Sequence, residues 1–180
     1  CMESVGSQKA RDCEKLIRLG EYARVIIFCN TKHMVDSLTH TLQKAGLDCD
    51  CLHGDMRQSL RNQVMGAFRE GKLQVLIATD VAARGIDVDD VDAVINYDVP
   101  DENAFYLHRI GRTARAGKEG VAYTFYAPDQ LSRLKEVLRL TGSQASMVRF
   151  NGFGKLEEVE QQEKREPMRA PSPPKLRRNR

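Results

Sequence analysis

Tryptophan is absent from the 180 residues, and only 6% of them are aromatic. No apolar run approaches the roughly 18 residues that a membrane-spanning helix needs, so we expect no membrane partner. The first residues show no charged-then-apolar signal sequence. Hydrophobic residues nevertheless make up 41% of the chain, which excludes a collagen-like or fully disordered protein and allows one domain with a core. Because the chain begins with Cys1, we expect it to be part of a longer protein.

The five cysteines are odd in number and form no CxxC pair, so the sequence indicates no disulfide framework. Cys13 and Cys29 occupy apolar patterns typical of reduced, buried thiols, which favours a cytoplasmic protein, or a nuclear one if the source is eukaryotic. Cys49, Cys51 and His53 alternate along a predicted strand and could face one metal ion. No fourth ligand follows at zinc-like spacing, so we predict ordinary strand packing and no metal.

Positive charge is concentrated at the C-terminal end. Residues 164–180 hold seven basic side chains against Glu166 alone, a net charge of +6, whereas the rest of the chain carries −3. The helix and strand patterns stop near residue 150, and four prolines follow. We therefore predict a folded domain over 1–150 and a flexible, disordered basic tail over 151–180. Such a tail either contacts the phosphates of a nucleic acid or only keeps the protein in solution.

Helix and strand patterns alternate along the rest of the chain. Short apolar runs predict strands at 25–29, 49–53, 75–79, 91–97 and 121–126. Apolar residues at helical spacing predict helices at 9–19, 32–45, 57–69 and 103–111, and a last helix that Asp129 caps and Gly142 ends. This order predicts an α/β domain with a mostly parallel sheet of five or six strands, covered by helices on both faces.

Two segments imitate nucleotide-binding motifs. Gly66–Lys72 has the GxxxxGK spacing of a phosphate loop, but Leu73 follows where a magnesium-binding Ser or Thr is needed. The segment also lies between a predicted helix and a following strand, the reverse of a phosphate loop. The strand that ends at Asp80 resembles a magnesium-holding strand but has no phosphate loop as its partner. We therefore expect that this chain alone does not hydrolyse ATP.

Arginine provides the phosphate-binding chemistry instead. Between His108 and Arg115 the chain holds three arginines, and Arg112 and Arg115 are one helical turn apart, so a helix would point both the same way. Paired guanidinium groups suit phosphate oxygens, although a solvated basic face has the same composition. Gly111 and Gly117 favour the phosphate interpretation, because they let the backbone approach a ligand.

A second segment, Ala78–Asp87, begins where the third predicted strand ends. Ligands bind beyond the carboxyl ends of strands in open parallel sheets. Taken alone, Asp80 is best interpreted as a helix cap.

Four segments together resemble the motifs of a known family in order and spacing, over about residues 9–140: Val25–Thr31, His53–Met56 with Gln58–Arg61, Ala78–Asp80 with Arg84–Asp87, and His108–Arg115. They are similar to motifs IV, IVa with its QxxR element, V and VI of the second, C-terminal RecA-like domain of DEAD-box ATP-dependent RNA helicases. Ala114 departs from the glycine that many members have. The family's first domain, with its phosphate loop and DEAD box, is not within these residues.

The resemblance implies a RecA-like three-layer fold and a role for each matching residue. The implied catalytic residues are Arg112, Arg115 and His108, with Arg115 nearest to an arginine finger. The implied cofactor contacts are Gly85, Asp87, Arg109, Arg112 and Arg115. The implied RNA-backbone contacts are Asn30, Thr31, Gly54, Gln58, Arg61, Thr79 and Asp80, donors and small residues that hold phosphates without reading bases.

The same resemblance implies the partners and cofactors. ATP and Mg²⁺ would be held mainly by the family's N-terminal RecA-like domain, which is the expected intramolecular partner, and RNA would be the substrate. Two other functions stay open at this point: a stand-alone RNA-binding module without catalysis, and a related helicase that acts on DNA. The sequence upstream of Cys1 would distinguish them, since a phosphate loop and DEAD box there indicate the RNA helicase.

Overall fold

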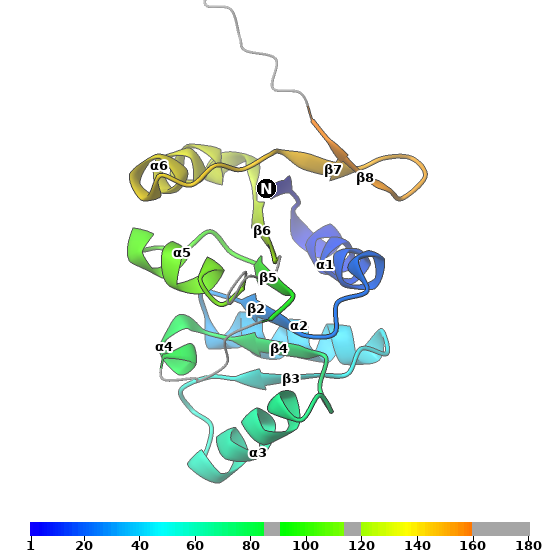
Figure 1. The fold of residues 1–180 in the computed structure, drawn as a ribbon, viewed down its shortest axis with the longest axis vertical. Helices are drawn as coiled ribbons and strands as arrows, with labels where there is room; N and C mark the ends of the chain where they lie inside the picture. The colour runs from blue at the N-terminus through cyan, green and yellow to red at the C-terminus, as the bar shows by residue number, and fades with distance from the viewer. Residues whose placement is uncertain (85–90, 114–119, 160–180) are drawn as a thin grey trace, which may run out of the picture.

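The computed structural model describes residues 1–84, 91–113 and 120–159. Within them eight strands form one sheet in the order β3-β4-β2-β5-β6-β1-β7-β8 (Figure 1). The strands are β1 (Met2–Glu3), β2 (Val25–Phe28), β3 (Cys49–Leu52), β4 (Val75–Ala78), β5 (Ala93–Asn96), β6 (Val121–Tyr126), β7 (Val148–Phe150) and β8 (Leu156–Glu158). The helices are α1 (Gly6–Gly20), α2 (Lys32–Lys44), α3 (Gln58–Arg69), α4 (Asp80–Ala83), α5 (Asn103–Ile110) and α6 (Leu131–Thr141), with a 3₁₀ turn, η1 (Pro128–Gln130), before α6.

The centre of the sheet is parallel, as the alternation of helices and strands predicts. The central strand β2 pairs with β4 on one side and β5 on the other, with Val25 opposite Val75 and Ala93. Every residue of β2, β4 and β5 is buried, because helices cover both faces of these strands. The five strands and five helices predicted from the sequence are all present, with ends that differ by a few residues at most.

Alternate residues of the central strands belong to two separate cores. Val25 and Ile27 face the layer formed by α1 and α2, whereas Ile26 and Phe28 face α3 and α4. A third cluster lies between α5, α6 and the end of β6, and includes Tyr106, Leu134 and Val137 (Figure 1). This is the three-layer arrangement that the sequence predicts, with helices on both faces of the sheet.

The sheet is larger than the five or six strands predicted. Strands β1, β7 and β8 have only two or three residues each, which is too short for a periodic pattern to reveal them. β7 and β8 form an antiparallel hairpin, in which Val148 pairs with Glu158. The domain boundary predicted at residue 150 therefore falls inside this hairpin. Of the tail predicted over 151–180, residues 160–180 lie outside the described residues.

The ends of the last helix show one difference from the prediction. Asp129 does not cap α6; it lies in η1, and Gln130 occupies the N-cap position. Gly142 ends the helix as predicted, with a left-handed φ of 66°.

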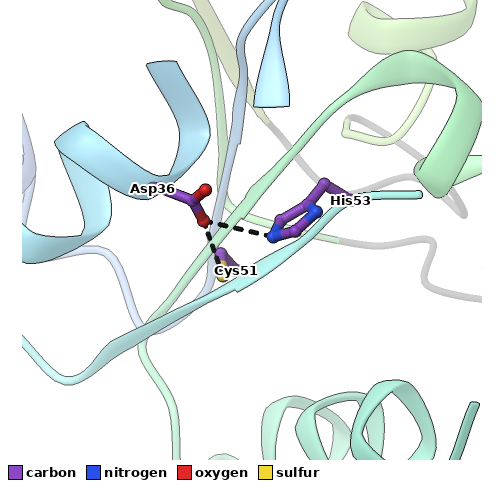
Figure 2. Close-up of side chains that lie close together, drawn as sticks. All are labelled: Asp36, Cys51 and His53. Carbon is purple, nitrogen blue, oxygen red and sulfur yellow. Dashed lines mark hydrogen bonds and ion pairs between the residues drawn. The ribbon is translucent and has the colours of Figure 1, made fainter. Parts of the chain in front are cut away.

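All five cysteines are free thiols. Cys13, Cys29 and Cys49 are buried in the core, and burial raises the pKa of Cys49 to about 11. Cys51 and His53 do not join Cys49 in the interior; they meet Asp36 of α2 at the surface of the domain (Figure 2). None of the described helices is long and apolar enough to cross a membrane.

Candidate functional site

The predicted site residues come together at one edge of the sheet. β2, β3, β4 and β5 run parallel, so their carboxyl ends lie side by side. Asn30 follows β2, Gly54 follows β3, and Thr79 follows β4, each within three residues of the end of its strand. Segments distant in sequence thus meet where parallel sheets bind ligands.

Arg109 of α5 links these segments. Its Nε and Nη2 donate to the two carboxylate oxygens of Asp80 at 2.8 and 2.6 Å. Nη1 donates to the backbone carbonyl of Asp98 at 2.8 Å, and Nη2 also donates to Asn30 Oδ1 at 2.9 Å. The guanidinium also lies over the ring of Phe28, 5.4 Å from its centroid. One side chain therefore joins the ends of β2, β4 and β5 to α5.

These contacts give Arg109 a structural role that the sequence did not predict. The side chain is only 1% exposed, and four of its hydrogen bonds go to acceptors within the domain. A guanidinium held this way supports the fold of the edge, and the nucleotide contact that the resemblance implies for Arg109 stays a prediction.

The side chains of Asn30 and Asp80 are engaged in the same network. Both carboxylate oxygens of Asp80 accept from Arg109, and Asn30 Nδ2 donates to the carbonyl of Val99 at 2.9 Å. A carboxylate also repels phosphate. These two side chains therefore hold the edge together, and the RNA-backbone contact that the resemblance implies for them stays a prediction.

Threonines cap two of the helices that begin at this edge. Thr31 Oγ1 accepts from the N–H of Met34 at the start of α2, and Thr79 Oγ1 accepts from the N–H of Ala82 in α4. The sequence alone suggested Asp80 as a helix cap, but the residue that caps α4 is Thr79. Neither hydroxyl donates its own hydrogen to another of the described residues, so each can still donate to a ligand. α2 and α3 have no acidic residue in their first turns, so their positive ends favour anions.

The remaining predicted RNA contacts lie on or beside α3. Gly54 and Gln58 are exposed, and Arg61 is partly buried. Arg61 donates to the backbone carbonyls of Ala82 at 3.1 Å and His53 at 3.4 Å, which ties α3 to α4 and to the end of β3.

A shallow hollow lies beside Arg109. It is lined by Phe28, Asp80, Ala83, Arg84, Phe105, His108, Arg109 and Arg112. His108 is exposed on the last turn of α5, and Arg112 lies in the turn after that helix. This turn is anchored to the sheet, because the carbonyl of Arg112 accepts from Val91 N–H at 3.2 Å and the hydroxyl of Thr113 donates to Val91 O at 2.6 Å.

Three of the predicted residues, Gly85, Asp87 and Arg115, lie outside the described residues, as does Gly117. The sequence analysis expected one helical turn to point Arg112 and Arg115 the same way. Arg112 is not in a helix, because α5 ends at Ile110. Gly111 is needed by its own helix: a Cβ there would lie 2.9 Å from the carbonyl oxygen of Leu107. The described structure therefore explains this glycine without a ligand.

The rejected phosphate-loop segment lies far from this hollow. Gly71 and Lys72 connect the end of α3 to the start of β4, and Lys72 Nζ pairs with Glu70 at 2.6 Å. They lie at the amino end of β4, the opposite edge of the sheet from the site, so the inverted order of helix and strand predicted from the sequence is confirmed.

Comparison with known proteins identifies the family. The family described as "Helicase conserved C-terminal domain" matches residues 8–117. The chain is 44% identical over 140 residues to mouse "Probable ATP-dependent RNA helicase DDX17", covering 78% of this chain and 22% of that protein. It is 47% identical over 114 residues to eukaryotic initiation factor 4A of Caenorhabditis elegans, covering 63% of this chain and 28% of that protein.

The chain is a helicase C-terminal domain of the DEAD-box RNA helicase family. Among solved structures, this DEAD-box domain superposes on Escherichia coli SrmB, bound to the regulator RraA, with a TM-score of 0.76, 37% identity and coverage of 81% of this chain and 86% of that chain. It also matches the C-terminal domain of Dbp5 with a TM-score of 0.73 and 34% identity, covering 83% and 87% of the two chains. The RecA-like fold expected from the motifs is confirmed, and this domain spans only about a quarter of its curated relatives.

Proposed function

We propose that this domain is the second half of an ATP-dependent RNA helicase that unwinds or remodels RNA. In the complete enzyme it would supply arginines to the ATP site and half of the surface that holds the RNA backbone. The relatives named above support this proposal, and the yeast Dbp5 structure bound to RNA and ADP BeF3 matches this domain with a TM-score of 0.73 and 34% identity. That match covers 81% of this chain and 39% of that one.

One observation carries the proposal: the RNA-contact candidates and the arginine hollow lie on the same edge of the sheet. Thr31 and Thr79 offer hydroxyl donors there, and the starts of α2 and α3 offer the positive ends of helices. Such donors bind phosphate oxygens and do not distinguish bases. A surface of this kind suits RNA of any sequence.

The residues present fit one side of an ATP site. Arg112 and His108 line the hollow, and Arg112 would direct its guanidinium to phosphate oxygens, with Arg115 beside it by the family motif. Gly85 and Asp87 would contact the nucleoside. ATP supplies the phosphoryl group and Mg²⁺ neutralises its charge when both are bound, mainly by the N-terminal RecA-like domain. The described part of this chain has no phosphate loop, so we propose that the chain alone does not turn over ATP.

The state of the cysteines supports a proposal for the cellular compartment of the protein. Five free cysteines, three of them deep in the core, suit a reducing environment. We therefore place the protein in the cytoplasm, or in the nucleus if its source is eukaryotic.

The RNA surface can be tested with a charge at Gly54. A Cβ at this position meets no atom within 4 Å, so Gly54→Glu should fold normally. The new carboxylate should weaken binding of single-stranded RNA to the complete protein about fivefold or more, because two like charges 4 Å apart cost about 1 kcal/mol even in water. Fluorescence anisotropy with labelled RNA, ADP and beryllium fluoride measures the change.

Gly66→Glu is the matched control for this experiment. Its Cβ also meets no atom within 4 Å, and it lies eight residues further along α3 than Gln58, about 12 Å from the edge. It should bind RNA as the wild type does. If Gly54→Glu and Gly66→Glu bind RNA with equal affinity, the RNA does not bind beside Gly54.

The basic segment 164–180 gives a second test. Its lysines and arginines should release counterions from RNA, so removing the segment from the 180-residue chain should weaken RNA binding most at low salt. Each lost phosphate contact should flatten the slope of log affinity against log salt by about 0.7 on single strands. Titrations at three salt concentrations with and without residues 164–180 measure both slopes. Equal slopes would leave the segment as a solubilising end only.

A further inference from the structure

Asp36, Cys51 and His53 bring three different ligand types to one point of the surface (Figure 2). The Oδ1 atom of Asp36 lies 3.1 Å from Nε2 of His53 and accepts from the thiol of Cys51 at 3.9 Å. All three atoms lie within 4.8 Å of one another. This cluster is separate from Arg109 and from the hollow described above.

The sequence pattern identified only part of this cluster. Cys51 and His53 are two residues apart at the end of β3, so they share one side of the strand, as the alternation predicts. Cys49 does not take part, because its thiol is buried and donates to the carbonyl of Thr39 at 3.7 Å. Asp36 replaces it from α2, the helix that packs against β3. The alternation of residues along a strand could not predict Asp36, because this residue comes from a helix.

We propose that Asp36, Cys51 and His53 form a site for a thiophilic divalent cation, with Zn²⁺ as the best fit. Zinc binds thiolate sulfur at about 2.3 Å and imidazole nitrogen or carboxylate oxygen at about 2.0–2.2 Å in tetrahedral geometry. Those bond lengths require separations between ligand atoms of about 3.4–3.6 Å. The separations from Asp36 Oδ1, 3.1 Å to His53 and 3.9 Å to Cys51, differ from these by a few tenths of an ångström, and the third pair, Cys51 Sγ and His53 Nε2, lies within 4.8 Å.

The chemistry of the three donors narrows the choice of ion. A sulfur and an imidazole nitrogen favour zinc over magnesium or calcium, which prefer oxygen ligands. The thiol of Cys51 must lose its proton to solvent when the ion binds. The thiolate and the carboxylate of Asp36 then balance the charge of a divalent ion, and His53 binds as the neutral ring.

The position of the cluster is suited to an ion that enters from solvent. The side chain of Asp36 is 57% exposed, whereas that of His53 is 14% exposed. Cys51 lies in β3 and pairs with Ile77 of β4 in the sheet, and His53 follows the end of β3 by one residue. The ion would thus meet one ligand on a strand, one directly after it and one on a helix, with its fourth position open to water. The neighbouring ion pair between Lys32 and Asp55 lies beside the cluster without occupying its ligand atoms.

Cobalt(II) is the probe for this site, because a cobalt–thiolate bond gives a charge-transfer band in the near ultraviolet. The experiment uses the 180-residue chain with Cys1→Ser, since an N-terminal cysteine can itself chelate metals. We expect one Co²⁺ per chain, a charge-transfer band that Zn²⁺ removes, and no band in the Cys51→Ser variant. Asp36→Asn and His53→Gln should each weaken Co²⁺ binding at least about tenfold, since even outer-shell changes cost that much.

His33→Gln is the matched control, because His33 is an exposed histidine one turn before Asp36 on the same helix and should leave binding unchanged. Circular dichroism checks that each variant is folded, and Asp36→Asn, at an exposed position, tests the site even if a β3 variant unfolds. The absence of a band at millimolar Co²⁺ would overturn the proposal. A band that survives Cys51→Ser, or affinities unchanged by both Asp36→Asn and His53→Gln, would also overturn it.

Discussion

Replacing Arg109 by methionine should lower the free energy of unfolding of this domain by about 3 kcal/mol or more. Methionine keeps most of the aliphatic packing but leaves the carboxylate of Asp80, 14% exposed, without the cation that neutralises it. It also removes the donors to Asn30 and to the Asp98 carbonyl. A domain of this size has only about 5–15 kcal/mol of stability in total, so the loss should be evident. Urea denaturation followed by circular dichroism measures it.

Two further variants test whether the loss of stability comes from the buried network or from the removal of any arginine. Arg18→Met removes an ion pair with Glu14 and a bond to the Ala45 carbonyl, but at a side chain that is 50% exposed, so it should cost less than about 1 kcal/mol. Asp80→Asn combined with Arg109→Met should be less destabilised than Arg109→Met alone, because no buried charge is left unpaired. If Arg109→Met and Arg18→Met cost the same, the linking role assigned to Arg109 is wrong.

The same network shows how far the sequence could predict the site. The motifs indicated which segments matter, and the strand order placed them at one edge of the sheet. The sequence did not show that Arg109 faces inward, because its partner Asn30 is 79 residues away and only the tertiary fold joins them. One signal was available: Arg109 follows the buried Tyr106 by three residues, so helical spacing puts both on the inner face of α5.

The fold was predictable for a physical reason that also sets its limit. Strands such as β2 and β4 are buried on both faces, so their residues form unbroken apolar runs that stand out in the sequence. The hairpin of β7 and β8 is partly exposed, and Arg149 and Glu157 pair across it. Its stability comes from pairing with β1, a strand about 145 residues earlier, where Met2 lies opposite Val148. No local pattern contains that information.

Arg112→Ala and Arg115→Ala should each lower the RNA-stimulated ATPase rate of the complete protein about a thousandfold or more, the usual effect of removing an arginine finger. Arg112 lines the hollow at the carboxyl edge of the sheet and is held in place by the anchored turn at Val91 and Thr113. A phosphate that gains charge during transfer would be stabilised by the planar, two-pronged guanidinium. Arg112→Lys should also be damaging, because one ammonium group does not reproduce that geometry.

Arg149→Ala is the control for this experiment, since its side chain is 68% exposed on β7, away from the edge of the sheet that carries the hollow. It should leave the ATPase rate unchanged. The thermal midpoint of each variant, measured in parallel, separates a catalytic from a structural role. Normal ATP turnover in Arg112→Ala and Arg115→Ala would refute the arginine-finger assignment. Unfolding of these variants would show that the two arginines support the fold. The isolated chain should show no turnover with RNA present, because the proposal places its arginines opposite a nucleotide that the N-terminal domain holds.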